Sequence, residues 1–205
     1  MISVVVSTFG DESWKSLSQR AVDSALNQLV AAEDVYYNHC ETLHEARNLG
    51  AEQAKGDWLV FLDADDELDY KYIGEMQRVI FEEGTSKPLL IQPHTLGVQG
   101  GKEDSHPVLI PRRNLIDANY LVIGTAVRRD QFLRVGGFRD LPLYEDWDLW
   151  LRCVMDGATV TSSLAIYRIH VNANSRNMPE REKQVEVYNQ IRKEYVGRWS
   201  KVRRA

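Results

Sequence analysis

Apolar and polar positions divide the first part of the chain into segments that predict strands and helices in alternation. Ile2–Ser7 is a run rich in β-branched residues, which is typical of a buried parallel strand. Within residues 14–29 the apolar positions recur at helical spacing, so we expect a helix that packs back onto the sheet. Trp58–Leu62 is apolar throughout and predicts a second buried strand.

The segments around these two strands continue the alternation. Asp34–Asn38 is a candidate strand, and Thr42 with Glu45 is a capping-box pattern that opens a helix. A helix over Tyr70–Phe81 and a strand over Leu89–Ile91 follow. The order predicts an α/β fold with a mainly parallel sheet flanked by helices.

The second half of the chain is less regular. Residues 93–107 contain three glycines and two prolines, so we expect a loop long enough to suggest a function. The change near residue 92 predicts two halves, 1–92 and 93–205, of a single compact domain. The other expected elements are strands at 108–110, 120–123 and 159–169, and helices at 129–135, from Glu145 and from Pro179.

The composition, 43% hydrophobic and 27% charged residues among 205, is that of an ordinary soluble domain. The net charge of −5 argues against a nucleic-acid partner, because binding to backbone phosphates requires a basic surface. Cys40 and Cys153 lie far apart in the sequence and outside any metal-binding pattern, so we expect free thiols in a reducing compartment. The sequence has no basic leader and no transmembrane segment, so a cytoplasmic location is expected.

Basic residues gather near the C-terminus. They are Arg198, Lys201, Arg203 and Arg204. Two interpretations stay open: a solvated tail, or contact with a phosphate-bearing ligand or an anionic membrane surface.

Three carboxylates follow directly after the buried strand at 58–62. Asp63, Asp65 and Asp66 surround Ala64 at the point where this strand should end, and ligands of parallel α/β sheets bind beyond that edge. Mutual repulsion would raise the pKa of some of these groups, and a divalent cation such as Mn²⁺ or Mg²⁺ would relieve it. The alternative is a solvated acidic turn that caps the next helix.

Two other motifs share this acidic pattern. An EF-hand beginning at Asp63 requires Gly at its sixth position and Glu at its twelfth, but the chain has Leu68 and Gly74 there. Haloacid-dehalogenase phosphatases also carry Asp-x-Asp after a strand, but they expect Thr or Val where this chain has Glu67. A phosphohydrolase with Asp63 as nucleophile therefore stays the weaker alternative.

Several further segments form an ordered set with the acidic cluster. They are Val4–Phe9, Asp23–Gln28, Ala46–Gly50, Ala54–Trp58, Phe61–Asp66, Val135–Phe138, Glu145–Arg152 and Tyr167–His170. In this order they resemble the inverting glycosyltransferases of family 2. The resemblance implies a GT-A fold with a Rossmann-like sheet, a nucleotide-sugar half at 1–92 and an acceptor half at 93–205.

The resemblance also implies a reaction. A hexose or amino sugar would pass from a nucleoside-diphosphate sugar, with a UDP-sugar favoured, to an acceptor hydroxyl with inversion at the anomeric carbon. A bound metal would neutralise charge on the leaving diphosphate, and a general base would take the acceptor proton. The acceptor is expected to be a glycan, a lipid-linked sugar at a membrane surface or a protein.

On the donor side, the resemblance assigns roles to residues of the first half and to His170. Asp65 would ligate the metal, and His170 would be either a second ligand or a structural histidine. Asp63 would contact the ribose or the metal shell, with Arg47 near Asp63 or the diphosphate. The other residues expected along the nucleotide are Thr8, Phe9, Asp11 and Ala64.

On the acceptor side, Asp146 is the predicted general base, with Glu145 as its neighbour. Both open a helix whose dipole favours their ionised forms, and simple helix capping is the alternative reading. Gly136 and Gly137 either let the backbone approach the donor sugar or end a helix. Trp147 is either a core residue, which we favour, or a platform for a sugar.

One family element is shortened in this chain. Family members usually have an Asp-Asp-Gly-Ser-type turn after the second strand, whose Asp recognises the nucleobase. Here Asp34–Asn38 leads almost directly to the helix that carries Ala46, so Asn38 and His39 are the candidate substitutes. The shortening also raises a second alternative, a non-catalytic module that binds a sugar nucleotide.

Overall fold

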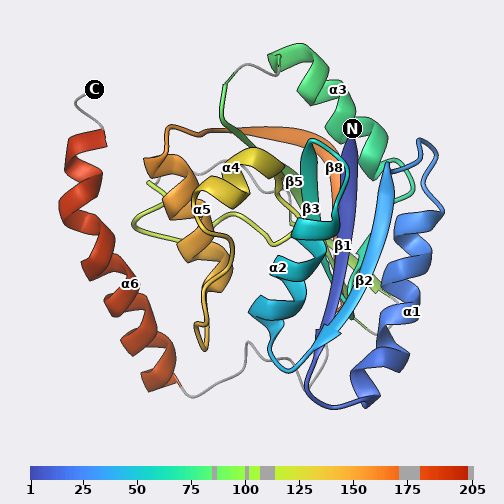
Figure 1. Ribbon diagram of the computed structural model, residues 1–205, viewed down its shortest axis with the longest axis horizontal. Coiled ribbons are helices and arrows are strands. Elements are labelled where there is room, and N and C mark those ends of the chain that lie inside the picture. The colour runs from blue at the N-terminus through green and yellow to red at the C-terminus, as the bar shows by residue number, and fades with distance from the viewer. Residues whose placement is uncertain (85–86, 100–101, 107–113, 171–180, 203–205) are drawn as a thin grey trace.

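The computed structural model describes residues 1–84, 87–99, 102–106, 114–170 and 181–202 (Figure 1). In chain order the elements are β1 (Ile2–Phe9), α1 (Ser13–Leu26), β2 (Asp34–Cys40), α2 (Leu43–Gln53), β3 (Trp58–Asp63), β4 (Glu67–Leu68), α3 (Tyr72–Glu83), β5 (Leu89–Gln99), β6 (Lys102–His106), β7 (Ala126–Arg128), α4 (Arg129–Arg134), α5 (Glu145–Met155), β8 (Thr159–His170) and α6 (Arg181–Val202). None of the helices in these ranges is long and apolar enough to cross a membrane.

A single sheet runs through the molecule in the order β2-β1-β3-β7-β5-β8-β4, with β6 paired to β5. The first three strands are parallel, as expected. The α/β class is confirmed, but the sheet is mixed, because β7 pairs antiparallel with both β3 and β5. The strand β7 has only three residues and comes from the second half of the chain. A segment of this length is too short to predict the strand or its antiparallel direction from the sequence.

The centre of the core is formed by β1 and β3, which are buried along almost their whole length. The crossover from β1 through α1 to β2 and the crossover from β2 through α2 to β3 run in opposite directions across the sheet, so right-handed connections place the two helices on opposite faces. The predicted capping box is confirmed, since Thr42 and Glu45 exchange hydrogen bonds at the start of α2. The register aligns Ser7 of β1 with Asp63 of β3, so both strands end at the same edge.

The second half differs most from the sequence-based expectation. The loop predicted at 93–107 is instead the outer part of β5 followed by β6, which pair antiparallel from Thr95–His106 to Gln99–Lys102. Residues 120–123 form no strand, while 108–110 and Pro179 lie outside the described residues. The change near residue 92 falls inside β5, so the two halves share one sheet.

The helix α6 lies beside α5 at the edge of the molecule (Figure 1). Its buried side chains Val187, Ile191 and Tyr195 face the core. The Tyr195 hydroxyl donates to Asp148 Oδ1 of α5 at 2.5 Å, and these interactions fasten the C-terminal helix to the rest of the domain.

Gly50 of α2 marks the tightest contact between a helix and the central sheet. A Cβ atom at this position would lie 2.3 Å from Val5 Cγ1 and 2.7 Å from Asn38 Nδ2. Gly50→Ala should therefore force α2 away from β1 and lower the free energy of unfolding by about 1–3 kcal/mol. Urea denaturation followed by circular dichroism measures the change.

Gly197→Ala in α6 is the matched control, because a Cβ there meets no atom within 4 Å. In a helix interior this change should stabilise by about 0.5–1 kcal/mol. Equal effects of the two substitutions would contradict the close approach of α2 to β1.

Candidate functional site

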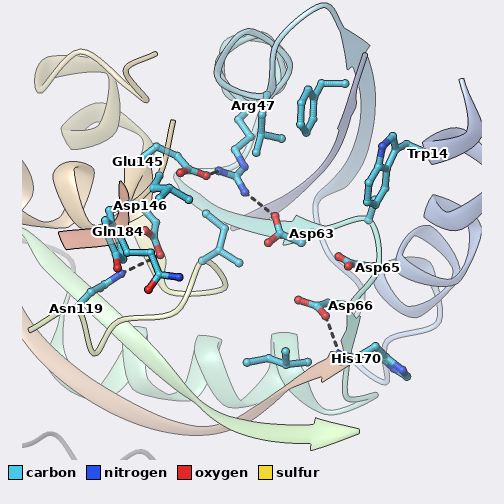
Figure 2. A pocket seen from close by; sticks show the side chains of 17 residues that line it. Trp14, Arg47, Asp63, Asp65, Asp66, Asn119, Glu145, Asp146, His170 and Gln184 are labelled. Carbon is cyan, nitrogen blue, oxygen red and sulfur yellow. Dashed lines mark hydrogen bonds and ion pairs between the residues drawn. The ribbon is translucent and has the colours of Figure 1, made fainter. Parts of the chain in front are cut away.

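A pocket of about 460 Å³ lies where β1 and β3 end, facing the start of α5 (Figure 2). This volume is in the range of small-molecule sites. Asp63, Asp65 and Asp66 line one side of it, and Glu145 and Asp146 line the other. The structure therefore brings together two acidic groups that are far apart in the sequence.

The buried side chain of Arg47, on α2, joins these two acidic groups. Its Nη2 donates to Asp63 Oδ1 at 2.6 Å and its Nη1 to Glu145 Oε1 at 2.8 Å, as Figure 2 shows. The guanidinium also lies 4.9 Å from the centroid of the Phe138 ring. Burial alone would lower the pKa of Arg47, but the charges of Asp63 and Glu145 outweigh it and raise that pKa. Arg47 is therefore a permanent cation in the wall of the pocket.

The next residue, Asn48, binds the backbone of Phe138, the residue whose ring lies beside Arg47. Its amide donates to the Phe138 carbonyl and accepts from the Phe138 N–H, both at 2.9 Å. A Cβ on Gly137 would lie 2.5 Å from Asn48 Oδ1, so only glycine leaves room for this pair of bonds. Arg152 of α5 donates to the Gly137 carbonyl at 2.7 Å. Two segments that the sequence singled out separately are thus packed against each other.

The acidic side of the pocket contains an unusual buried carboxylate. Asp66 is 6% exposed, and its Oδ1 accepts from the His170 backbone N–H at 2.9 Å. Burial, followed by the nearby charges of Asp63 and Asp65, raises the pKa of Asp66 well above its usual range. Crowded carboxylates with raised pKa values are the arrangement that a divalent cation would relieve.

The chemistry of these side chains fits a hard cation only in part. The described residues contain no group of three or more His, Cys, Asp or Glu side chains arranged to hold a metal. Asp65 lies at the pocket, where Mg²⁺ or Mn²⁺ would take one or two carboxylates and complete its shell with phosphate oxygens. The His170 ring bonds through Nε2 to Glu67 Oε2 at 2.9 Å, so only its Nδ1 could ligate a metal while this bond is in place.

On the opposite side, Asp146 begins α5 with its carboxylate held by two donors. Oδ1 accepts from the Trp147 backbone N–H at 2.7 Å, and Oδ2 accepts from Asn119 Nδ2 at 3.2 Å. Burial, followed by the charge of Glu145, raises the pKa of Asp146 to about 6. A carboxylate with this pKa is ionised at neutral pH yet basic enough to accept a proton.

The other residues predicted along the nucleotide fall into two sets. Phe9 and Ala64 line the pocket. Thr8 lies outside its lining, where its hydroxyl bonds to Tyr37 Oη at 2.8 Å and His39 Nδ1 at 2.9 Å. Asp11 also lies outside and accepts from the Ser13 N–H at 2.7 Å, at the start of α1.

The predicted residues of the acceptor side also lie outside the pocket lining, apart from the Glu145-Asp146 pair. Gly136 and Gly137 have φ values of 88° and 63° and follow the end of α4, as the helix-ending interpretation expects. Trp147 is fully buried, and its indole N–H donates to the Leu115 carbonyl at 2.7 Å. Its ring stacks on Tyr188, with 5.0 Å between the ring centroids. The structure therefore places the two glycines at a helix end and Trp147 in the core.

The structure adds pocket residues that the sequence did not indicate: Trp14, Asn119, Tyr144 and Gln184. Trp14 looks like a core-facing position of a helix, and Asn119 and Gln184 stand in no motif. Tyr144 has a φ of 61°, which is strained for a non-glycine residue, immediately before Glu145. A left-handed tyrosine has no signal in a single sequence.

Comparisons with known proteins agree with this fold. The model of the family "Glycosyl transferase family 2" matches residues 34–116. The structure of residues 1–349 of S. aureus TarS in complex with UDP is similar, with a TM-score of 0.61 and 15% identity over 83% of this chain and 60% of that one. The same protein in complex with UDP-GlcNAc gives a TM-score of 0.65 and 14% identity over 87% and 61%. No curated protein matches.

The fold class is therefore the GT-A class of α/β proteins. The match of the family model to residues 34–116 agrees with the family that the motifs predicted, and the solved structures agree with its fold. The chain spans about 60% of the TarS 1–349 structures that it resembles.

The Arg47 bridge gives a direct prediction for stability. Arg47→Met leaves Glu145, which is 7% exposed, without its cation, so the free energy of unfolding should fall by about 3–5 kcal/mol. Adding Glu145→Gln should recover part of the loss, because it removes the uncompensated charge. Chemical denaturation of the single and double variants measures both effects.

Arg134→Met is the matched control, since its ion pair with Asp156 lies at the surface with Arg134 50% exposed. It should cost less than about 1 kcal/mol. Similar losses for Arg47→Met and Arg134→Met would show that Arg47 is not a structural bridge.

Proposed function

We propose that this chain transfers a sugar from a nucleoside-diphosphate sugar, with a UDP-sugar favoured, to an acceptor hydroxyl with inversion at the anomeric carbon. The observation that carries the proposal is one pocket with Asp63, Asp65 and Asp66 on one side and Asp146 on the other. These sides correspond to the two requirements of such a displacement, a place for the leaving diphosphate and a base on the opposite face of the sugar. The family match and the UDP and UDP-GlcNAc complexes of the similar TarS structures support this choice of donor.

The donor would lie along the end of β3. Phe9, Trp14 and Ala64 line this part of the pocket and supply apolar surface for the nucleoside. Asp63, fixed by Arg47, would accept a hydrogen bond from a ribose hydroxyl. Asp65 and Asp66 would hold a Mn²⁺ or Mg²⁺ ion, which when bound neutralises charge on the diphosphate.

The base would be Asp146. Its carboxylate accepts the proton of the acceptor hydroxyl while that oxygen bonds to the anomeric carbon and the bond to the diphosphate oxygen breaks. Glu145 does not compete for this role, because Arg47 holds it in an ion pair at 2.8 Å. The division between Glu145 as an anchor and Asp146 as the base follows from these two environments.

The donor specificity is tested with a panel of UDP-, GDP-, dTDP- and CDP-sugars in the presence of Mn²⁺. Release of the nucleoside diphosphate should be strongest with a UDP-sugar and should stop with EDTA. Asp65→Ala should lose metal-dependent donor binding in titration calorimetry, while Asp140→Ala, an exposed aspartate outside the pocket lining, should keep it.

Two outcomes of the panel would contradict the proposal. Hydrolysis of simple phosphate esters through a phosphoenzyme on Asp63 would indicate a phosphohydrolase. Donor binding without release of nucleoside diphosphate, with or without acceptor sugars, would indicate a binding module.

The role of Asp146 predicts a pH dependence with a definite sign. The base works only when ionised and its pKa is raised to about 6, so kcat/KM should rise with pH through about 6 and then level off. Asp146→Asn should bind the donor with unchanged affinity and lose turnover by about 10²–10⁴-fold. Steady-state kinetics across the pH range and donor titrations measure the two effects.

The control for this substitution is Asp140→Asn, which should leave both the rate and the pH profile unchanged. If Asp146→Asn retains the full rate, another group is the base.

A further inference from the structure

We propose that Asn119 is a positioning residue for Asp146, whose side-chain amide fixes the carboxylate in the orientation from which it accepts the acceptor proton. This inference rests on the proposed function, since it assigns Asn119 a task only if Asp146 is the base. Asn119, Asp146 and Gln184 lie together at one end of the pocket, away from Asp65 and His170 (Figure 2).

The geometry of the carboxylate supports this assignment. An Asp side chain rotates broadly about its last torsion, so a fixed orientation requires a partner on each oxygen. Trp147 N–H binds Oδ1 at 2.7 Å, and Asn119 Nδ2 binds Oδ2 at 3.2 Å. The first bond comes from the residue next in sequence and the second from a separate segment, so Asn119 fixes the rotation relative to the pocket.

Asn119 is itself held in place by three other elements. The Trp147 indole of α5 donates to the Leu115 carbonyl at 2.7 Å, and Gln92 of β5 donates to the Tyr120 carbonyl at 2.9 Å. The Tyr188 hydroxyl of α6 donates to the Asp117 carbonyl at 2.8 Å. The segment has no regular secondary structure, yet these bonds fix its backbone on both sides of Asn119.

The amide oxygen of Asn119 differs from its amide nitrogen, which binds Asp146. Asn119 Oδ1 is buried and has no hydrogen-bond partner among the described residues. A buried acceptor without a partner is unfavourable, and the bond of the same amide to Asp146 offsets this cost.

The charges around Asp146 explain why a neutral donor matters. Glu145 precedes it and raises its pKa, as burial does, whereas Arg47 and the hydrogen bonds from Trp147 and Asn119 lower it. Arg47 is already shared between Asp63 and Glu145. Asn119 therefore favours the ionised form of the base without adding a cation that would hold it in an ion pair.

The test replaces Asn119 by leucine, which has a similar size and no donor, with Asn119→Ala as a second variant. At pH about 6 kcat should fall by more than about tenfold, and at pH about 9 by only a few fold, because the midpoint of the profile moves up by about one unit. KM for the donor should stay within about twofold. Asn119→Ser, which keeps a donor, should restore part of the wild-type profile.

Asn114→Ala is the matched control, because Asn114 lies in the same segment and donates to Asp117 rather than to Asp146. Its pH profile should equal that of the wild type. Thermal unfolding of each variant shows whether it folds. If Asn119→Leu or Asn119→Ala does not fold, the pH profile of the other variant tests the inference.

A second measurement separates this inference from the proposed function. The carboxyl carbon of Asp146, labelled with ¹³C and assigned by its loss in Asp146→Asn, should titrate about one pH unit higher in Asn119→Leu than in the wild type. If the wild type transfers no sugar but this shift occurs, the proposed function fails and the control of Asp146 by Asn119 stands. An unchanged midpoint, or an unchanged rate profile in an active enzyme, overturns the inference.

Discussion

The ion pairs of Arg47 hold the pocket together. Its guanidinium is buried between Asp63 at the end of β3 and Glu145 at the start of α5, and one cation thus fixes the two walls of the site relative to each other. A buried ion pair is stable only when both partners remain in place, so the geometry tolerates little displacement. The adjacent Asn48 reinforces the arrangement through its two hydrogen bonds to Phe138.

The carboxylates of the pocket have three different environments. Asp63 and Glu145 share the single positive charge of Arg47, whereas Asp66 is buried among other acids and has a raised pKa. Asp146 is held by neutral donors only, with a pKa of about 6. The same side-chain chemistry can thus supply an anchor, a candidate cation site and a candidate base, because burial and neighbouring charges differ at each position.

Much of the second half of the chain works as a support for this site. The rings of Trp147 on α5 and Tyr188 on α6 stack, and Arg152 donates to the carbonyl of Gly137. Several residues of the family-like motifs therefore pack in the core or end a helix. They affect the site indirectly, because they set the position of the N-terminus of α5, where Glu145 and Asp146 lie.

The sequence by itself determined the elements of the first half other than the short strand β4, together with the capping box at Thr42 and the acidic cluster after β3. These features are local, since periodicity and caps are written within a few residues. Its ordered motifs also indicated the family whose model matches residues 34–116.

The tertiary structure decided the rest: the antiparallel entry of β7, the β5–β6 hairpin, the His170–Glu67 pair and the contact of Asn119 with Asp146. Arg47 and Glu145 are separated by 98 residues, and their ion pair exists only because the sheet register and the packing of α2 against Phe138 bring them together. Contacts of this kind depend on the relative placement of elements, which the local pattern of a single sequence does not encode.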